Sequence, residues 1–214
     1  MGRWLLVRHA ESTWNQERRL QGQSDPPLSP QGQAQAQALR QRLKRFSIAH
    51  TYASDLTRAV QTAHIVLEGR SIPLTLTPAL REFAFGPWEG KLYDVLTRED
   101  PIRFRQFMTG DPSFEPPPGG ETRQQVLQRV GAFIAHVRQH HLQDDILIVS
   151  HGGCLRAVVV ALLGLPVETL WRFRLAPASI SVIEVDTHNA RLVVWNDASH
   201  YLNGDLPRPG GPAA

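Results

Sequence analysis

The sequence contains a single cysteine, Cys154, among its 214 residues. One thiol excludes an intramolecular disulfide, a redox pair of cysteines and a zinc centre built from several cysteines. Lysine is almost as scarce, because only Lys44 and Lys91 stand among 23 basic residues. The basic residues also form no block of the kind that predicts binding to nucleic acid or to a membrane surface. These features are compatible with a reducing compartment, and we expect a cytoplasmic protein with neither of those partners.

Long hydrophobic runs are missing as well. The longest, residues 157–165, is much shorter than the roughly 20 residues that span a membrane. The apolar residues 4–7 meet Arg8 and His9 too early for a signal peptide. Hydrophobic residues nevertheless make up 42% of the chain, which is ordinary for a globular protein. We therefore predict one domain over residues 1–205 and a disordered tail, rich in proline and glycine, over residues 206–214.

The first half of the chain alternates strand and helix patterns. Residues 4–7 form an apolar run without periodicity, which predicts a strand buried on both faces, and residues 146–149 repeat that signature. Ser29 and Pro30 predict a helix start, and a second helix is expected after Asp55, with Gly69 as its stop. This alternation predicts an α/β fold, a three-layer α/β/α sandwich around a mostly parallel sheet.

The second half contains a segment of a different kind. Proline and glycine interrupt residues 83–120, which predicts short helices and loops that form a small lid over about residues 85–120. Helices are expected over residues 121–141 and 152–163, with a strand beginning at residue 146. Residues 179–185 and 192–195 predict an antiparallel hairpin at the end of the sheet. Because an exposed strand edge is usually paired or covered, we expect a homodimer.

Polar side chains follow the predicted strands at the positions where ligands bind in a parallel α/β sheet. Arg8 and His9 come directly after the first strand, and His151 and Gly152 follow the later one. Arg58 opens a helix after a third strand, where free backbone N–H groups favour an anion and a guanidinium adds a forked clamp for phosphate. The sequence therefore predicts a crevice that binds an oxyanion between two histidines.

Several segments together resemble the histidine phosphatase superfamily, also called phosphoglycerate-mutase-like. Position 10 departs from the family pattern, because it is Ala where the opening motif most often has Gly. The matching segments occur in the family's order and cover most of residues 3–156; they are Leu6–Asn15, Leu28–Gly32, Ser54–Ala63, Leu80–Glu82 with Phe85–Gly90, and Val149–Gly153.

The resemblance implies that His9 is the nucleophile, since a neutral imidazole attacks phosphorus readily and later leaves readily. The cations Arg8 and Arg58 are expected to lower the pKa of His9 from its reference of about 6.5. By the same resemblance, Arg8, Arg58, Asn15 and His151, with Gly152 beside it, would hold the phosphoryl oxygens, where charge accumulates in the transition state.

The resemblance also implies that Glu82 protonates the leaving alkoxide and then deprotonates the attacking water. Gln21 matches a polar residue near the phosphoryl site of family phosphatases. The family chemistry implied here needs neither a metal nor a cofactor. Its partner is a small phosphorylated metabolite.

Four other features have simpler explanations. Phe85 and Trp88 are expected to pack under the lid, and Cys154 to open a packed helix. The segment before the long helix includes Glu121 and resembles a family segment that borders the site, but an ordinary helix start explains it. His140 and His141 with the acids that follow are expected to form a solvated helix end rather than a metal site. Whether Arg172 and Arg174 touch substrate or a partner subunit stays open.

The substrate is harder to predict than the chemistry. Phosphoserine ranks first, because Arg81, Arg103 and Arg105 could pair with its carboxylate, although Ala84 stands where phosphoserine-cleaving relatives often have His. The alternatives are α-ribazole phosphate and a sugar phosphate. A phosphoglycerate mutase is disfavoured, because residues 82–86 differ from the Glu-Arg-His-Tyr-Gly stretch of the mutases. A non-catalytic phospholigand-binding module is disfavoured because His9 and Glu82 are both present.

Overall fold

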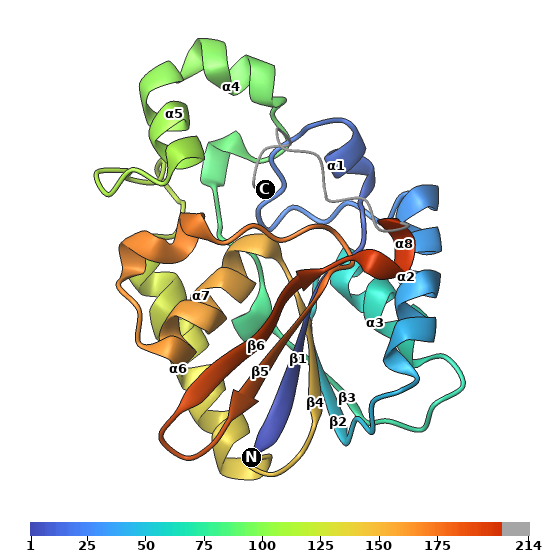
Figure 1. Cartoon of the computed structure of the whole chain (residues 1–214). Helices are drawn as coiled ribbons and strands as arrows, with labels where there is room; N and C mark the ends of the chain where they lie inside the picture. Colours follow the sequence, from blue (N-terminus) through green and yellow to red (C-terminus); the bar gives the residue numbers. More distant parts are fainter. Residues whose placement is uncertain (203–214) are drawn as a thin grey trace.

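The computed structural model describes residues 1–202, in which one mixed sheet of six strands lies between two layers of helices (Figure 1). The strand order is β3-β2-β4-β1-β5-β6. The first four strands of that order pair in parallel, whereas β5 pairs antiparallel with β1 and with β6. The predicted α/β fold with a mostly parallel sheet is therefore confirmed. The strands are β1 (Gly2–Arg8), β2 (His50–Ser54), β3 (Leu74–Thr77), β4 (Ile146–Ser150), β5 (Ile180–Val185) and β6 (Ala190–Asp197).

Two hydrophobic clusters fill the two sides of the sheet. In β1, Trp4 and Leu6 belong to the cluster that includes α6 (Arg123–His140) and α7 (Gly152–Leu163). The alternate residues, Leu5 and Val7, join the cluster that includes α2 (Pro30–Leu43) and α3 (Thr57–Leu67). Successive strand residues point to opposite faces, so an uninterrupted apolar run supplies both cores. This arrangement explains why β1 and β4 have no amphipathic period.

Short helices lie beyond the end of the sheet at which the parallel strands finish (Figure 1). We call α4 (Tyr93–Glu99) and α5 (Pro101–Thr109) the cap. Buried aromatic side chains hold the cap together: Trp88 lies 5.8 Å from Phe104 and 6.1 Å from Phe107, measured between ring centroids. The remaining short elements are α1 (Thr13–Gln16), η1 (Pro78–Leu80), η2 (Gly86–Trp88), η3 (Val167–Arg172) and α8 (Ser199–Leu202).

Local chemistry explains where the helices begin. Ser29 caps α2, because its side chain accepts a hydrogen bond from the backbone N–H of Gly32 and Pro30 occupies the first turn. The long helix α6 begins at Arg123, two residues later than predicted from residue 121. The reason is a capping box in which Thr122 is the N-cap residue and Gln125 its reciprocal partner. Gly69 follows the end of α3 with a φ of +76°, which suits glycine.

The strand pattern missed β3, which pairs with β2 at the edge of the sheet. None of its four residues, Leu74–Thr77, is buried, and Leu76 is 46% exposed. So short an edge strand carries little hydrophobic signal. The predicted hairpin at the other edge is confirmed as β5 and β6. The predicted disordered tail, 206–214, lies outside the described residues. No helix within residues 1–202 has the length and apolar character to cross a membrane.

Candidate active site

Polar residues from three separate parts of the chain meet at the ends of the parallel strands. His9 follows β1, Arg58 lies in the first turn of α3, and His151 is the N-cap residue of α7, directly after β4. His9 and Arg58 line a cavity at this place, whereas His151 is not among the described residues that line it. The residues that line it are Arg8, His9, Leu20, Gln21, Gly22, Arg58, Glu82, Phe83, Phe85, Phe107, Gly153, Arg156 and Trp171.

His9 is held so that one ring nitrogen is available. Its Nδ1 lies 2.7 Å from the carbonyl oxygen of Ala10, which can only accept a hydrogen bond. Nδ1 therefore carries the proton, and Nε2 keeps its lone pair. Burial lowers the pKa of His9 well below its usual 6.5, and the nearby charges of Arg58 and Arg8 lower it further. The imidazole is therefore neutral at physiological pH, as a nucleophile must be.

Two buried guanidinium groups flank His9. Arg58 is fully buried and donates to the carbonyl oxygens of Ser24 and Gly22, both at 2.7 Å. Arg8 is 4% exposed and donates to the carbonyl oxygen of Leu175 at 2.6 Å. Burial lowers the pKa of Arg58 to about 10, which still leaves it charged at neutral pH. Backbone carbonyls thus fix two cations in a site with little access to water, where their attraction for an anion is strong.

His151 lies beside His9, with 5.0 Å between the ring centroids. Its Nε2 lies 2.8 Å from the hydroxyl of Ser54, which also accepts from the backbone N–H of Leu56. Nε2 is thus paired with the Ser54 hydroxyl. Nδ1 of the same ring is buried and has no hydrogen-bond partner among residues 1–202. Burial, followed by the charge of Arg58, lowers the pKa of His151 well below 6.5, so the neutral form dominates.

Glu82 follows η1 and lines the same cavity. Its carboxylate accepts from the backbone N–H groups of Phe83, Gly153 and Cys154 at 2.9 to 3.0 Å. Two of these donors, Gly153 and Cys154, belong to the first turn of α7. A side chain at position 153 would not fit, because a Cβ there would lie 2.5 Å from Oε1 of Glu82. The carboxylate is thus held against the N-terminus of the helix that His151 caps.

Asn15 and Gln21 meet at Ser12, a buried residue that the sequence analysis did not single out. Oδ1 of Asn15 accepts from the backbone N–H of Ser12 at 2.9 Å, which closes the capping box of α1. Oε1 of Gln21 lies 2.8 Å from the Ser12 hydroxyl. Gln21 lines the cavity, whereas Asn15, His151 and Gly152 are not among the lining residues that the structure describes. Their contacts with substrate stay predictions.

The sequence analysis missed most of the cavity wall. We call Phe83, Phe85, Phe107 and Trp171 the aromatic wall; Phe107 and Phe83 meet Trp171 edge to face at 5.7 and 5.9 Å between ring centroids. Arg156 also lines the cavity, is 1% exposed and lies 5.7 Å from the Trp171 ring. A signal for it existed in the sequence. Arg156 stands four positions after Gly152, so the two share a helix face.

The arginines expected to pair with a substrate carboxylate lie elsewhere. Arg81 forms a bidentate ion pair with Asp55, in which Nε and Nη2 donate to the two carboxylate oxygens at 2.7 and 2.6 Å. Arg103 pairs with Asp100 on the cap. Arg105 is exposed. None of the three is among the described residues that line the cavity. The local sequence placed them near Glu82 or in the cap, but their side chains pair with acids outside the cavity or face solvent.

Within residues 1–202, no group of three or more His, Cys, Asp or Glu side chains is arranged to hold a metal ion. At the C-terminal end of α6, Nδ1 of His141 contacts the carboxylate of Asp144 at 2.9 Å, while Nδ1 of His140 donates to the carbonyl oxygen of His136. These contacts describe an ordinary helix end.

Comparisons with known proteins agree on one family. The profile of the histidine phosphatase superfamily (branch 1) matches residues 4–198. A protein from Salmonella choleraesuis named probable phosphoglycerate mutase GpmB is 40% identical over 179 residues, which are 84% of this chain and 83% of that protein.

Two solved structures illustrate the range of relatives. The α-ribazole phosphatase of Shigella flexneri is 34% identical, has a TM-score of 0.83, and is similar over 92% of this chain and 96% of that chain. A mutant phosphoserine phosphatase of Entamoeba histolytica in complex with phosphoserine is 25% identical, has a TM-score of 0.81, and is similar over 94% of this chain and all of that one.

Proposed function

The chain belongs to the histidine phosphatase superfamily, and we propose that it hydrolyses phosphomonoesters through a phosphohistidine formed on His9. One observation carries the proposal. The buried imidazole of His9 donates a hydrogen bond from Nδ1–H to the carbonyl oxygen of Ala10, and the charges of Arg8 and Arg58 lie nearby. This arrangement leaves a neutral, nucleophilic Nε2 beside two cations. A phosphoryl group is the substrate that combines an electrophilic centre with oxygens for both cations.

In the proposed first step, Nε2 of His9 attacks phosphorus, the bond from phosphorus to the ester oxygen breaks, and Glu82 gives its proton to the departing alcohol. Arg8 and Arg58 stabilise the negative charge on the phosphoryl oxygens, and Nδ1–H of His151 donates to one of them. In the second step, Glu82 takes a proton from water as the water attacks phosphorus and the bond to Nε2 breaks. Phosphate and neutral His9 are the products.

The intermediate can be trapped. After incubation with a ³²P-labelled phosphomonoester and rapid denaturation, we expect label on His9 that is lost in acid and survives in base. Vanadate should inhibit, since its trigonal-bipyramidal form copies the transition state. Label on another residue, or complete loss of activity with EDTA, would overturn the proposal.

The role of Glu82 has its own test. Glu82→Gln should slow turnover of alkyl phosphates by about 10²- to 10⁴-fold, because their leaving groups need a proton. Turnover of p-nitrophenyl phosphate should fall much less, since its leaving group is stable without one. An equal loss on both substrates would assign Glu82 another role.

Phosphoserine remains the first candidate substrate, now for a different reason. Arg156 supplies a buried cation in the same cavity as His9, where a carboxylate could be paired. The aromatic wall favours the second candidate, α-ribazole phosphate, because flat rings pack well against Phe and Trp. A sugar phosphate is the third. The comparison of kcat/KM across these substrates decides, and phosphoserine should lead by at least about tenfold.

Phosphoglycerate mutase is the second candidate function, because the Salmonella relative carries that name. The two activities differ in the fate of the phosphoryl group. With 3-phosphoglycerate, a mutase forms 2-phosphoglycerate, whereas the proposed phosphatase releases inorganic phosphate and glycerate. Measuring both products in one reaction separates them, and we expect phosphate release to dominate.

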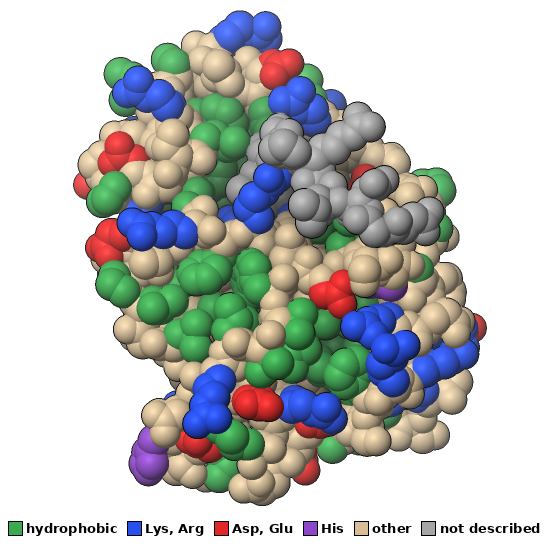
Figure 2. All heavy atoms as spheres, in the orientation of Figure 1, with side chains coloured by type: hydrophobic (Ala, Val, Ile, Leu, Met, Phe, Trp, Pro, Cys, Tyr) green, Lys and Arg blue, Asp and Glu red, His purple; other side chains and the backbone are tan. Residues whose placement is uncertain are grey.

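We also propose a homodimer formed along β6. This strand is at the edge of the sheet, and its Val193 and Val194 are 54% and 36% exposed. Figure 2 shows hydrophobic side chains gathered over and beside the β5–β6 hairpin. An open apolar edge is a ready partner for a second strand. Light scattering at micromolar protein should give twice the monomer mass, and a monomer mass would contradict the proposal.

A further inference from the structure

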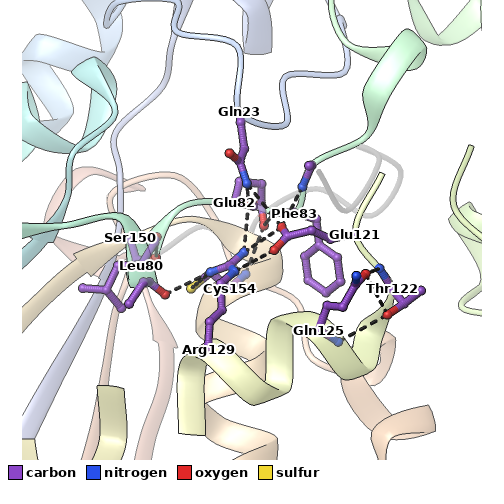
Figure 3. Close-up of polar contacts among 12 residues, drawn as sticks. Gln23, Leu80, Glu82, Phe83, Glu121, Thr122, Gln125, Arg129, Ser150 and Cys154 are labelled. Carbon is purple, nitrogen blue, oxygen red and sulfur yellow. Dashed lines mark hydrogen bonds and ion pairs between the residues drawn. The ribbon is translucent and has the colours of Figure 1, made fainter. Parts of the chain in front are cut away.

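The backbone around Glu82 contacts an ion pair that the proposed mechanism does not use. Glu121 precedes α6 and Arg129 lies on its second turn, and both point at the backbone around Glu82 (Figure 3). Nε and Nη2 of Arg129 donate hydrogen bonds to the two carboxylate oxygens of Glu121, at 2.9 and 3.1 Å. The two side chains are only 19% and 21% exposed. Neither residue is among the described residues that line the cavity.

The pair grips the peptide segment that carries Glu82. Nη2 of Arg129 donates to the carbonyl oxygen of Glu82 at 3.0 Å, while Nη1 donates to the carbonyl oxygen of Ala79 at 2.9 Å. On the other side, Oε2 of Glu121 accepts from the backbone N–H of Ala84 at 2.9 Å. The backbone N–H of Glu121 also donates to the carbonyl oxygen of Ala84 at 2.8 Å. The residues before, at and after Glu82 are therefore fixed to one clamp.

A third side chain completes the clamp. Nε2 of Gln23 lies 3.2 Å both from the carbonyl oxygen of Glu82 and from Oε2 of Glu121. The carbonyl of Glu82 thus accepts from two side chains, and Oε2 of Glu121 from three groups. The carboxylate of Glu82 is held separately, by the N–H groups of Phe83 and α7. Backbone and carboxylate are anchored by different elements, so together they set where the carboxyl group sits relative to His9.

Proton transfer requires such precision. A donor must stand within hydrogen-bond reach of the leaving oxygen, and a misplacement of about 1 Å can cost on the order of a hundredfold in rate. A sequestered ion pair, by contrast, is weak support for fold stability, because desolvation offsets much of the attraction. The multiple bonds from one forked guanidinium are better suited to fixing geometry.

We propose that Glu121 and Arg129 are positioning residues that place Glu82 for proton transfer. This inference rests on the proposed role of Glu82 as proton carrier. It assigns neither residue a contact with substrate. It predicts that disturbing the clamp slows turnover of alkyl phosphates more than turnover of p-nitrophenyl phosphate, as Glu82→Gln does but to a smaller extent. A general loss of activity is not expected.

The first experiment compares two leaving groups. We expect Arg129→Met to lower kcat for an alkyl phosphate by about ten- to a hundredfold, with KM nearly unchanged and p-nitrophenyl phosphate turnover reduced less than about threefold. Arg129→Lys keeps the charge without the fork, so it should restore only part of the rate. Glu121→Gln preserves size and should show the same selectivity if Arg129→Met fails to fold. As a matched control, Arg40→Met breaks another Arg–Glu pair, with Glu68 on the surface, and should change neither rate.

The second experiment combines variants. If Arg129 acts through Glu82, adding Arg129→Met to Glu82→Gln should not change the ratio of the two turnover rates further. A purely structural role would instead lower both rates equally and in step with the urea midpoint of unfolding, and that result would overturn the inference. If Glu82→Gln itself shows no leaving-group dependence, the proposed role of Glu82 fails and this inference falls with it. A selective Glu82→Gln combined with unselective Arg129→Met and Glu121→Gln variants would overturn this inference alone.

Discussion

The floor and the wall of the cavity are built in opposite ways. We call Arg8, His9 and Arg58, which line the cavity, together with His151, whose ring lies 5.0 Å from that of His9, the floor; it is polar and lies at strand ends and helix starts. Three of its residues bind backbone carbonyls, which fix their positions. The aromatic wall is held by ring contacts and draws Phe107 from the cap and Trp171 from η3. In the proposed mechanism the floor meets the phosphoryl group and the wall meets the alcohol, so we propose that chemistry and selectivity belong to different parts of the molecule.

The strongest test of this division is to remove the proposed nucleophile. His9→Ala should lower kcat by about 10⁶-fold, a loss typical of deleting a covalent nucleophile. The reduction should be the same for phosphoserine and for p-nitrophenyl phosphate, because every substrate presents the same phosphoryl group. Steady-state assays with both substrates measure it. A loss that depends strongly on the alcohol would mean that the floor also contributes to selectivity.

Arg58→Lys tests the floor's cations at a smaller scale. Loss of one donor to the transition-state oxygens should reduce kcat by about 10²- to 10³-fold on every substrate. Lysine keeps the charge but lacks the planar guanidinium. It therefore cannot donate at the same time to the carbonyl oxygens of Ser24 and Gly22 and to the phosphoryl group. Urea unfolding of the variant should accompany the kinetics, so that a loss of folded protein is not mistaken for a catalytic effect.

Phe107→Leu addresses the wall. We expect kcat/KM for p-nitrophenyl phosphate to fall by roughly tenfold relative to phosphoserine, since one pocket contact is worth about 1 to 3 kcal/mol of discrimination. Phe114→Leu is the matched control, because Phe114 contacts Phe107 at 5.6 Å between ring centroids but is not among the described lining residues. Parallel changes on both substrates would place Phe107 in the support of the floor.

The smallest expected effect is a displacement of the pH profile. Burial and the charges of Arg58 and Arg8 lower the pKa of His9 below 6.5, so the acid limb of log kcat/KM should lie below that pH. Arg58→Met removes a positive charge, which raises the pKa of His9 and moves the limb to higher pH. Arg58→Lys keeps the charge and should leave the limb near its original position. Identical limbs in both variants would show that a different group controls it.

The same division explains what could be predicted from the sequence. The floor residues follow short apolar strands or open helices, and a local pattern of that kind predicts both the strand and the polar residue after it. Phe83 and Trp171 come together although 88 positions separate them in the chain (171 − 83 = 88). Nothing local marks an aromatic residue as lining a cavity rather than filling a core.

Edge strands and the directions of side chains were the other features that could not be predicted from the sequence. β3 has four residues and little burial, so its pairing with β2 decides its conformation more than its own composition does. Arg81 is adjacent to Glu82 in sequence but turns to Asp55. The clamp of Glu121 and Arg129 depends on how α6 packs against the backbone around Glu82, which only the tertiary structure reveals.

The position of β4 has a consequence for how the protein comes into being. This strand lies between β1 and β2, and its register with β1 joins Trp4 to Ile146, 142 positions apart (146 − 4 = 142). During synthesis, the first two strands emerge with the place between them empty until about residue 150 has left the ribosome. Long-range pairing of this kind is slow to form, and unpaired strand edges are prone to aggregate. A nascent chain that stalls before β4 would therefore hold His9 and Arg58 without a common site, and would depend on chaperones for protection.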